Sequence, residues 1–388
     1  MVTLTSAENA LKTLYLGVVA DQLNTNVNPL LAKISQTTSD VWGKEIRKLA
    51  PFGINGGIGA GTEDGTLPGA ASNNYAQFVL TLKNLYGTIE ISDKAIRASQ
   101  NNSGAFVNLL EAEMEGLIKA SKFNFGRMLF GDGSGVLCKA SAQSGNVITV
   151  DSVKNVIEGM VVDVVDASTK GVVVSARRIT DVDRSAKIIT LAGASIAAST
   201  VSAGDCVTVQ GSYGNELTGL GAIFGNSETL YGLTRSANKW LAPYKATSTE
   251  INDVVIQKAI DTLDEVAGSV ADFIVCSAGV KRAYQDYLIT NRSNIDVMNL
   301  QGGYKAISYN GIPVVSDRFA PEGTMYILNT SDFHLHQLCD WRWLEGDDGR
   351  VIKQVANKPV YTATLVKYAD MICDRPIGQA VISGITEK

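Results

Sequence analysis

Residues 51–75 constrain the fold more than any other stretch of this chain. The segment, PFGINGGIGAGTEDGTLPGAASNNY, is rich in glycine, contains two prolines and has almost no large apolar side chains. Because such a stretch cannot bury a core of its own, it predicts a long mobile loop. Its glycines do not indicate a phosphate-binding loop, since no Gly-Lys-Ser/Thr run leads from them into a helix. The chain returns through AQFVLTLKNLYGTIEIS, where alternating apolar residues predict a strand.

Composition narrows the class of protein. The chain has 388 residues, of which 45% are hydrophobic and 19% charged, so it can form a sizeable core in two or three folding units. Its net charge of -5 provides no basic field for gripping a nucleic-acid backbone. The five cysteines include no CxxC pair, which favours buried reduced thiols over a zinc or disulfide framework. We expect no signal peptide, and no run reaches the ~20 apolar residues that span a bilayer.

The clearest predicted helix runs from about Gly104 to Phe130. Its apolar residues recur at spacings of three and four, and Ser103 is a candidate N-cap. At 1.5 Å per residue this helix would be roughly 40 Å long. The sequence GDGSG, residues 131–135, ends it. Because these glycines follow a helix, they indicate a C-cap and linker and not a dinucleotide-binding fingerprint.

The second half of the chain changes character twice. Residues 138–213 contain short runs rich in Val, Ile and Thr, which predict a small all-β module such as a barrel. Gly- and Ser-rich joints bound this module, and helical patterning resumes after it, so it is interpreted as an insertion. From about Thr249, amphipathic helices alternate with short strands, and Asn310-Gly311 marks a tight hairpin turn. The order of elements predicts an α+β fold and not a regular βαβ array.

Both histidines of the chain lie in FHLHQLCDWRW, residues 333–343. The period of two predicts a strand, with the tryptophans on its buried face and His334 and His336 on its polar face. Two imidazoles about 7 Å apart along a strand can share a metal only with ligands from elsewhere, and nothing nearby has the spacing to supply them. No Gly-x-Ser-x-Gly elbow occurs. We therefore expect no catalytic residue, metal or cofactor, and a metal-dependent hydrolase is the least favoured function.

The acidic cluster and the basic clusters of the chain can be explained without a metal site or a DNA-binding site. EGDDGR, residues 345–350, has three carboxylates within four residues but lacks the alternating ligands and distal Glu of a calcium loop, so a hairpin turn is predicted. The basic clusters at 44–48 and 177–178 are short. Solvated faces or acidic partners on a neighbouring subunit account for them as well as DNA does.

Four stretches, taken in order, resemble the major capsid protein of tailed double-stranded-DNA bacteriophages, the Hong Kong 97-type fold. They are LYGTIEISDKAIRAS after the Gly-rich loop, the long helix ending in FGDGSG, ELTGLGAIFGNSETLYGLTRS at 216–236 and YNGIPVVSDRFAPEGTMYILNTSDFHLH at 309–336. The resemblance covers most of the chain except about 138–213. That segment is similar to the insertion domain found in some members.

The resemblance implies an α+β, Hong Kong 97-type capsid fold with a small all-β insertion domain. The expected parts are an N-terminal arm at 1–50, an extended β-hairpin loop at 51–90, a peripheral domain at 91–137 with the spine helix 104–130, the insertion domain at 138–213, a peripheral continuation at 214–248, an axial domain at 249–358 and closing peripheral and axial strands at 359–388. This division places the strand 333–343 in the axial region.

The resemblance also implies a structural, non-enzymatic function. Such a protein assembles as hexamers and pentamers into an icosahedral head that encloses phage double-stranded DNA without sequence-specific binding. Its expected partners are further copies of itself, a separate scaffolding protein, a portal and decoration proteins, with no membrane. It would be located in the virion after assembly in the bacterial cytoplasm. The alternative is an encapsulin-like compartment shell with the same fold.

A shell needs many modest contacts per subunit, and long arms and loops supply them. The predicted contacts lie at the tip of the extended loop, in an axial loop near 290–304 and at the histidine pair. The candidate residues are Gly56, Gly61, Thr62, Glu63, Asp64, Asn291, Arg292, Asn294, Gly302, His334 and His336. Histidines that face another subunit would make assembly respond to mildly acidic pH.

Overall fold

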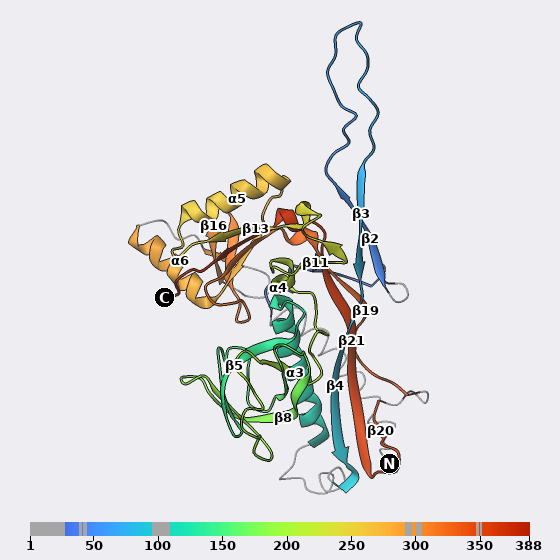
Figure 1. Cartoon of the computed structure of the whole chain (residues 1–388), viewed down its shortest axis with the longest axis vertical. Helices are drawn as coiled ribbons and strands as arrows, with labels where there is room; N and C mark the ends of the chain where they lie inside the picture. The colour runs from blue at the N-terminus through green and yellow to red at the C-terminus, as the bar shows by residue number, and fades with distance from the viewer. Residues whose placement is uncertain are drawn as a thin grey trace.

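The structure is a computed structural model that describes residues 28–38, 41, 45–94, 109–291, 297–299, 305–346, 349 and 351–388. These residues form a long sheet with a helix across it, a closed β-barrel, a second sheet with two helices, and a projecting hairpin (Figure 1). Within these ranges no helix is both long and apolar enough to cross a membrane.

The helix α3 (Leu109–Phe130) packs against the long sheet and forms the main core with it. Met114, Ile118 and other apolar residues of the helix are buried in this core. Gly87 allows the close approach, because a Cβ atom there would lie 2.9 Å from Leu117. The strand order is β1–β19–β21–β20, and β4 also pairs with β21. The strands are β1 (Ser35–Thr37), β4 (Lys83–Ser92), β19 (Phe333–Trp343), β20 (Lys353–Gln354) and β21 (Val360–Cys373).

The predicted spine helix is confirmed from Leu109 to its end at Phe130. At that end the backbone N–H of Gly131 donates to the carbonyl of Met128, 3.0 Å away. The predicted start at Ser103 and Gly104 lies outside the described residues.

The strand predicted at 333–343 is confirmed as β19. It pairs antiparallel with β21 and parallel with β1, inside the long sheet. Trp341 and Trp343 are buried in the main core, and the Phe125 ring of α3 meets Trp341 edge-on at 6.4 Å. The alternation of side chains fixes which face of a strand is buried, but it does not say which distant strand will pair with it.

The predicted all-β insertion is a closed barrel of order β10–β5–β6–β9–β8–β7. Its interior is filled by fully buried aliphatic side chains such as Ile148, Val162 and Ile179. The first and last strands are neighbours, and the backbone N–H of Gly214 donates to the carbonyl of Ser134, so the two joints lie together. The strands are β5 (Val136–Ser144), β6 (Val147–Val150), β7 (Val161–Val165), β8 (Val172–Asp183), β9 (Ile188–Leu191) and β10 (Cys206–Val209).

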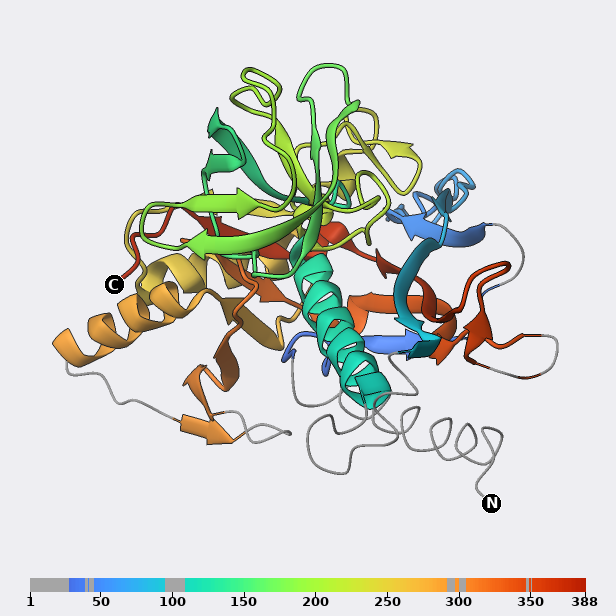
Figure 2. The ribbon, with the colours of Figure 1, turned by 90° about the horizontal axis from the view of Figure 1, so that it is seen from below.

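The second sheet has seven strands in the order β13–β22–β18–β14–β17–β16–β15, with α5 and α6 beside it (Figure 2). Asn252 and Ser277 cap the two helices by accepting N–H bonds, and Gly268 ends α5 in the left-handed conformation. The hairpin predicted at Asn310-Gly311 is confirmed, since both residues have the positive φ of a type I′ turn. The elements are β13 (Tyr244–Thr247), α5 (Asp253–Ala267), β14 (Phe273–Cys276), α6 (Ala278–Thr290), β15 (Val297–Asn299), β16 (Lys305–Tyr309), β17 (Ile312–Ser316), β18 (Met325–Leu328) and β22 (Ala380–Ser383).

Short elements connect these units. They are α4 (Leu220–Ile223), β11 (Thr229–Leu230), β12 (Leu233–Thr234) and the 3-10 turns η1 (Lys239–Leu241), η2 (Thr330–Asp332) and η3 (Pro376–Gly378). The segment 217–241 therefore runs from the barrel exit to the base of the projecting hairpin.

A buried ion pair ties the barrel exit to the spine helix. Arg127 of α3 donates from Nη2 to Glu216 Oε1 at 2.5 Å and from Nη1 to Oε2 at 2.8 Å. The exposed fractions of the two side chains are 4% and 3%. Two residues further on, Thr218 donates from its backbone N–H and its hydroxyl to the buried carboxylate of Asp370 in β21. The chain leaving the barrel is thus fixed to both layers of the main core.

We predict that Glu216→Ala destabilises the folded subunit by about 3–5 kcal/mol, because it leaves the Arg127 guanidinium buried and uncompensated. Urea unfolding of the unassembled subunit, followed by tryptophan fluorescence, measures the change. The matched control is Glu158→Ala, which removes the partner of Arg184 in an exposed ion pair on the barrel. The control is expected to leave the unfolding midpoint almost unchanged, and equal losses for both variants would contradict the prediction.

Asp317 is a buried carboxyl where the barrel meets the second sheet. Its Oδ1 accepts the backbone N–H of Phe319 at 2.9 Å, while Oδ2 has no hydrogen-bond partner among the described residues. Lys154 of the barrel reaches the same turn and donates to the carbonyl of Ala320. Burial raises the pKa of Asp317 from 3.8 to about 6, and the Phe319 N–H and nearby cations offset this only in part.

The raised pKa predicts that acid stabilises this junction. Since the folded state binds the Asp317 proton more tightly than the unfolded state, the free energy of unfolding rises as pH falls from 7 through 6, and the gain levels off below about 4. Between about pH 7 and 5 the wild type should gain about 1 kcal/mol relative to Asp317→Asn. Urea unfolding of both proteins across this range tests it, and parallel pH profiles would refute it.

Candidate assembly surfaces

A long hairpin extends beyond the rest of the chain (Figure 1). Its strands β2 (Ile46–Phe52) and β3 (Asn74–Leu80) pair only with each other among the described residues. The loop between them, residues 53–73, exposes apolar side chains: Ile54 is 84% exposed, Ile58 86% and Leu67 90%. Apolar side chains gathered on an arm without a core of its own are typical of surfaces that become buried in an assembly.

This loop carries five of the predicted contact residues. The backbone N–H of Gly65 donates to the carbonyl of Thr62 at 3.0 Å and closes a turn that presents Glu63 and Asp64 at its corner. All five predicted residues of the loop are exposed: Gly56, Gly61, Thr62, Glu63 and Asp64. They are accessible to a neighbouring subunit, and contact with one remains a prediction.

A separate apolar cluster holds the base of the hairpin. Phe78 of β3 is 1% exposed, and its ring centroid lies 5.8 Å from that of Trp240. Phe52 of β2 also stacks on the Trp240 ring, with the ring centroids 5.0 Å apart. The backbone N–H of Val79 donates to the carbonyl of Tyr231 at 2.9 Å. No pattern in the sequence had indicated this anchor, although Tyr231 lies in one of the stretches that carry the resemblance.

His334 belongs to the same region and bonds within its own chain. Its Nδ1 lies 2.6 Å from Ser35 Oγ of β1, and its Nε2 lies 3.2 Å from Asp374 Oδ2. The same carboxylate oxygen accepts a bond from Lys48 Nζ of β2 at 2.6 Å. The His334 side chain is part of a polar joint between β1, β19 and the hairpin base, and no spacing of residues along the chain signals this joint.

His336 is only 2% exposed, so its predicted place among the surface or interface polar groups of the strand is wrong. The strand face that alternation assigned to solvent is covered at this end. Ile372, the register partner of His334, packs into the cluster at the hairpin base. The two imidazole rings lie 6.3 Å apart. In the described part of the chain, no group of three His, Cys, Asp or Glu side chains is placed to hold a metal ion.

The remaining predicted contacts lie near the end of α6. Asn291 follows the helix, and its side-chain amide donates to the carbonyl of Tyr287 at 2.9 Å. Arg292, Asn294 and Gly302 lie outside the described residues. The carboxylate cluster at 345–350 is described only in part.

The cysteines are all free thiols. Three are buried, and burial raises the pKa of Cys138 and of Cys276 to about 12. Cys206 and Cys339 are partly exposed. The expectation of buried reduced thiols therefore holds for Cys138, Cys276 and Cys373.

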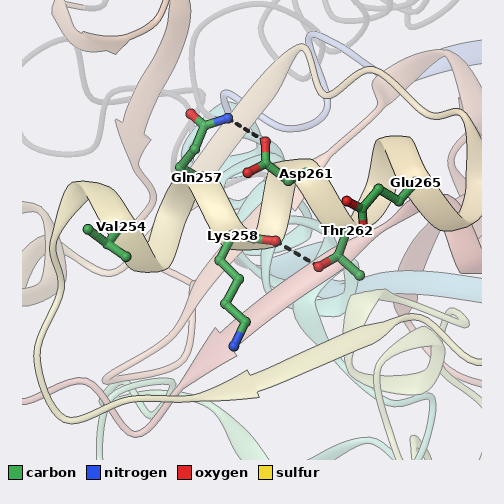
Figure 3. A pocket seen from close by; sticks show the side chains of 6 residues that line it. All are labelled: Val254, Gln257, Lys258, Asp261, Thr262 and Glu265. Atoms are coloured by element: carbon green, nitrogen blue, oxygen red, sulfur yellow. Dashed lines mark hydrogen bonds between the residues drawn. The ribbon is translucent and has the colours of Figure 1, made fainter.

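A shallow hollow on the outer side of α5 is lined by residues of that one helix (Figure 3). Gln257 donates to Asp261 at 2.6 Å, and the hydroxyl of Thr262 donates to the carbonyl of Lys258. Val254 and Glu265 lie toward its two ends. Because all of its lining residues belong to this one helix, the hollow lacks the enclosed shape of a ligand site.

Comparison with solved structures identifies the fold. The capsid protein in the asymmetric unit of cyanophage A-1(L) superposes with a TM-score of 0.57 at 12% identity, covering 94% of this chain and 92% of that chain. The chain has the Hong Kong 97-type capsid fold.

Two other structures match the capsid fold with lower scores. The SrpI encapsulin of Synechococcus elongatus gives a TM-score of 0.49 at 9% identity, covering 95% of both chains. The capsid of a native GTA particle gives 0.47 at 11% identity, covering 92% of this chain and 90% of that one. Likenesses at these scores do not distinguish one kind of shell from another. No protein-family profile and no curated protein sequence matches the chain.

The anchor at the hairpin base generates a third prediction. Phe78→Ala should destabilise the subunit by about 3–5 kcal/mol, because it empties a fully buried site between the hairpin and its anchor. Limited proteolysis is expected to cut the hairpin faster in this variant, and urea unfolding gives the energy. Tyr75→Ala, which removes an exposed ring from the same strand, should change neither the rate of cleavage nor the free energy of unfolding. Equal cleavage rates in the two variants would show that Phe78 does not anchor the hairpin.

Proposed function

We propose that this chain is the major capsid protein of a tailed bacteriophage. It assembles as hexamers and pentamers into an icosahedral head that encloses double-stranded DNA. The observation that carries the proposal is the likeness to the cyanophage A-1(L) capsid protein along nearly the full length of both chains.

The shape and surface of the subunit support this role. The buried Arg127–Glu216 pair and the main core make a stiff plate, while the loop 53–73 offers apolar side chains that its own chain leaves exposed. A stiff plate with a projecting arm suits heterologous contacts that close into rings and then into a shell. The net charge of -5 suits a container that must release packaged DNA.

The other parts of the proposal concern the division of the chain into domains and the proteins with which it assembles. We keep the seven expected segments as its domain scheme, except that the strand 333–343 now belongs with the peripheral domain. Further partners are a separate scaffolding protein, a portal and decoration proteins, and assembly takes place in the bacterial cytoplasm before the protein becomes part of the virion. The exposed loop tip, Asn291 and His334 remain the proposed contact residues among those described.

An encapsulin-like compartment is the alternative with the same fold. The inserted barrel and the long arm favour the phage capsid. Electron microscopy of purified particles, with an assay of nuclease-protected DNA, separates the two. Shells that contain DNA support the phage role, as does a gene for this protein that lies beside portal and terminase genes. Shells that contain only a protein cargo support the compartment. A chain that stays monomeric alone and with its neighbours under every assembly condition contradicts both.

Deletion of residues 55–72 tests the role of the projecting loop. The loop contributes nothing to the buried clusters, so the monomer should keep its circular dichroism spectrum and its unfolding midpoint. Shell formation should fall at least tenfold, because the arm that reaches the neighbouring subunit is gone. Electron microscopy and sedimentation count the shells, and a wild-type yield from the deletion would remove the loop from the assembly mechanism.

A further inference from the structure

The chain contains two Asn-Gly pairs, and the fold treats them differently. Asn55-Gly56 lies in the projecting loop, and Asn310-Gly311 forms the turn between β16 and β17. An asparagine that precedes glycine readily loses its side-chain amide, because no Cβ atom shields the next backbone nitrogen or restricts its rotation. Asn310 is exposed and Asn55 partly exposed. Burial therefore does not protect Asn310, and the hydrogen bonds around each pair decide its reactivity.

Loss of the amide requires two groups of the pair to meet. The backbone nitrogen of the glycine attacks Cγ of the asparagine, a nitrogen–carbon bond forms, and the proton of the backbone N–H leaves with the side-chain amide as ammonia. Water then opens the resulting five-membered ring at either carbonyl, which gives aspartate or isoaspartate. The rate depends on whether the glycine N–H is available and whether the chain can bring Cγ to it.

At Asn310-Gly311 both reacting groups are held in place. The backbone N–H of Gly311 donates to Ser308 Oγ at 3.1 Å, and Asn310 Nδ2 donates to Gln257 Oε1 at 3.1 Å. The positive φ angles of 48° and 81° fix the turn, and the paired strands on either side stop it from rearranging. This pair is restrained although it lies at the surface.

At Asn55-Gly56 the same groups are available. The pairing of β2 with β3 ends at Phe52, before this pair, and Gly56 is exposed. In the described part of the chain nothing accepts a hydrogen bond from the Gly56 N–H. The backbone N–H of Gly57 donates to Asn55 Oδ1 at 2.9 Å. Because Oδ1 takes up negative charge when Cγ is attacked, this donor stabilises the addition.

We infer that Asn55 is a site of spontaneous deamidation in the folded subunit, whereas the fold protects Asn310. The reaction needs only the chain itself and water. Its product places a carboxylate in residues 53–61, GINGGIGAG, which carry no charge. In the isoaspartate form the main chain also runs through the former side chain and is one methylene longer. The inference goes beyond the proposed shell function and does not depend on it, because it concerns the unassembled subunit.

Peptide mapping of aged protein tests the inference. The folded, unassembled subunit is kept in mildly alkaline buffer, and mass spectrometry follows the conversion of each asparagine to a carboxylic acid. Asn55 should react about tenfold faster than Asn310 or more. In urea, where the turn and its hydrogen bonds are lost, the two rates should agree within about threefold. Equal rates in the folded subunit, or an Asn55 that keeps its amide there while the unfolded chain loses it, overturn the inference.

Three substitutions separate the causes. Gly56→Ala should slow the reaction of Asn55 about fivefold or more, because it shields the attacking nitrogen. Gly61→Ala is the matched control in the same loop and should leave the rate unchanged, since a Cβ atom fits without a clash at both positions. Ser308→Ala releases the Gly311 N–H and should speed the reaction of Asn310 about threefold or more while leaving Asn55 unchanged.

Circular dichroism confirms that each variant is folded before its rates are compared. Equal slowing by Gly56→Ala and Gly61→Ala would show that the neighbouring glycine does not control Asn55. An Asn310 rate that Ser308→Ala does not change would show that the hydrogen bond to Gly311 does not protect this pair.

Discussion

The Arg127–Glu216 pair is the interaction on which the arrangement of the subunit depends. The chain that leaves an inserted barrel must rejoin the rest of the fold at a fixed place. Otherwise the strands and helices that follow cannot pack in their correct positions. The bidentate pair does this at the point of exit, inside the main core and away from water. Replacing a buried pair by apolar residues is often no less stable, so its value lies in the position it imposes more than in energy. The segment 217–241 then runs from a fixed start to the base of the hairpin.

Because the start of the segment 217–241 is fixed, the base of the hairpin that it contacts is also held in place. The apolar cluster around Phe78 and Trp240, with the polar joint at Lys48, Asp374 and His334, holds the base, while the loop beyond it packs on nothing in the described part of its own chain. The subunit thus combines a rigid body with exposed apolar side chains at a distance from it. In a monomer this would be an aggregation hazard, whereas in a closed assembly it becomes buried surface.

Much of this architecture followed from the sequence, and the exceptions have physical causes. The end of α3, the barrel strands and the Asn310-Gly311 turn were predictable because periodicity and turn chemistry are local. The place of β19 was not, because strand pairing across hundreds of residues leaves no local signal. His336 was assigned to the polar face because its strand alternates, yet its side chain is buried in the folded subunit.

The joined ends of the barrel have a consequence for the diversity of such shells. Since the backbone N–H of Gly214 donates to the carbonyl of Ser134, the two chain connections between the body of the subunit and the barrel lie side by side. Whatever lies between these residues can lengthen, shrink or be exchanged without altering the span that the body must bridge. The barrel can therefore change in length or sequence while the two sheets and α3 keep their arrangement.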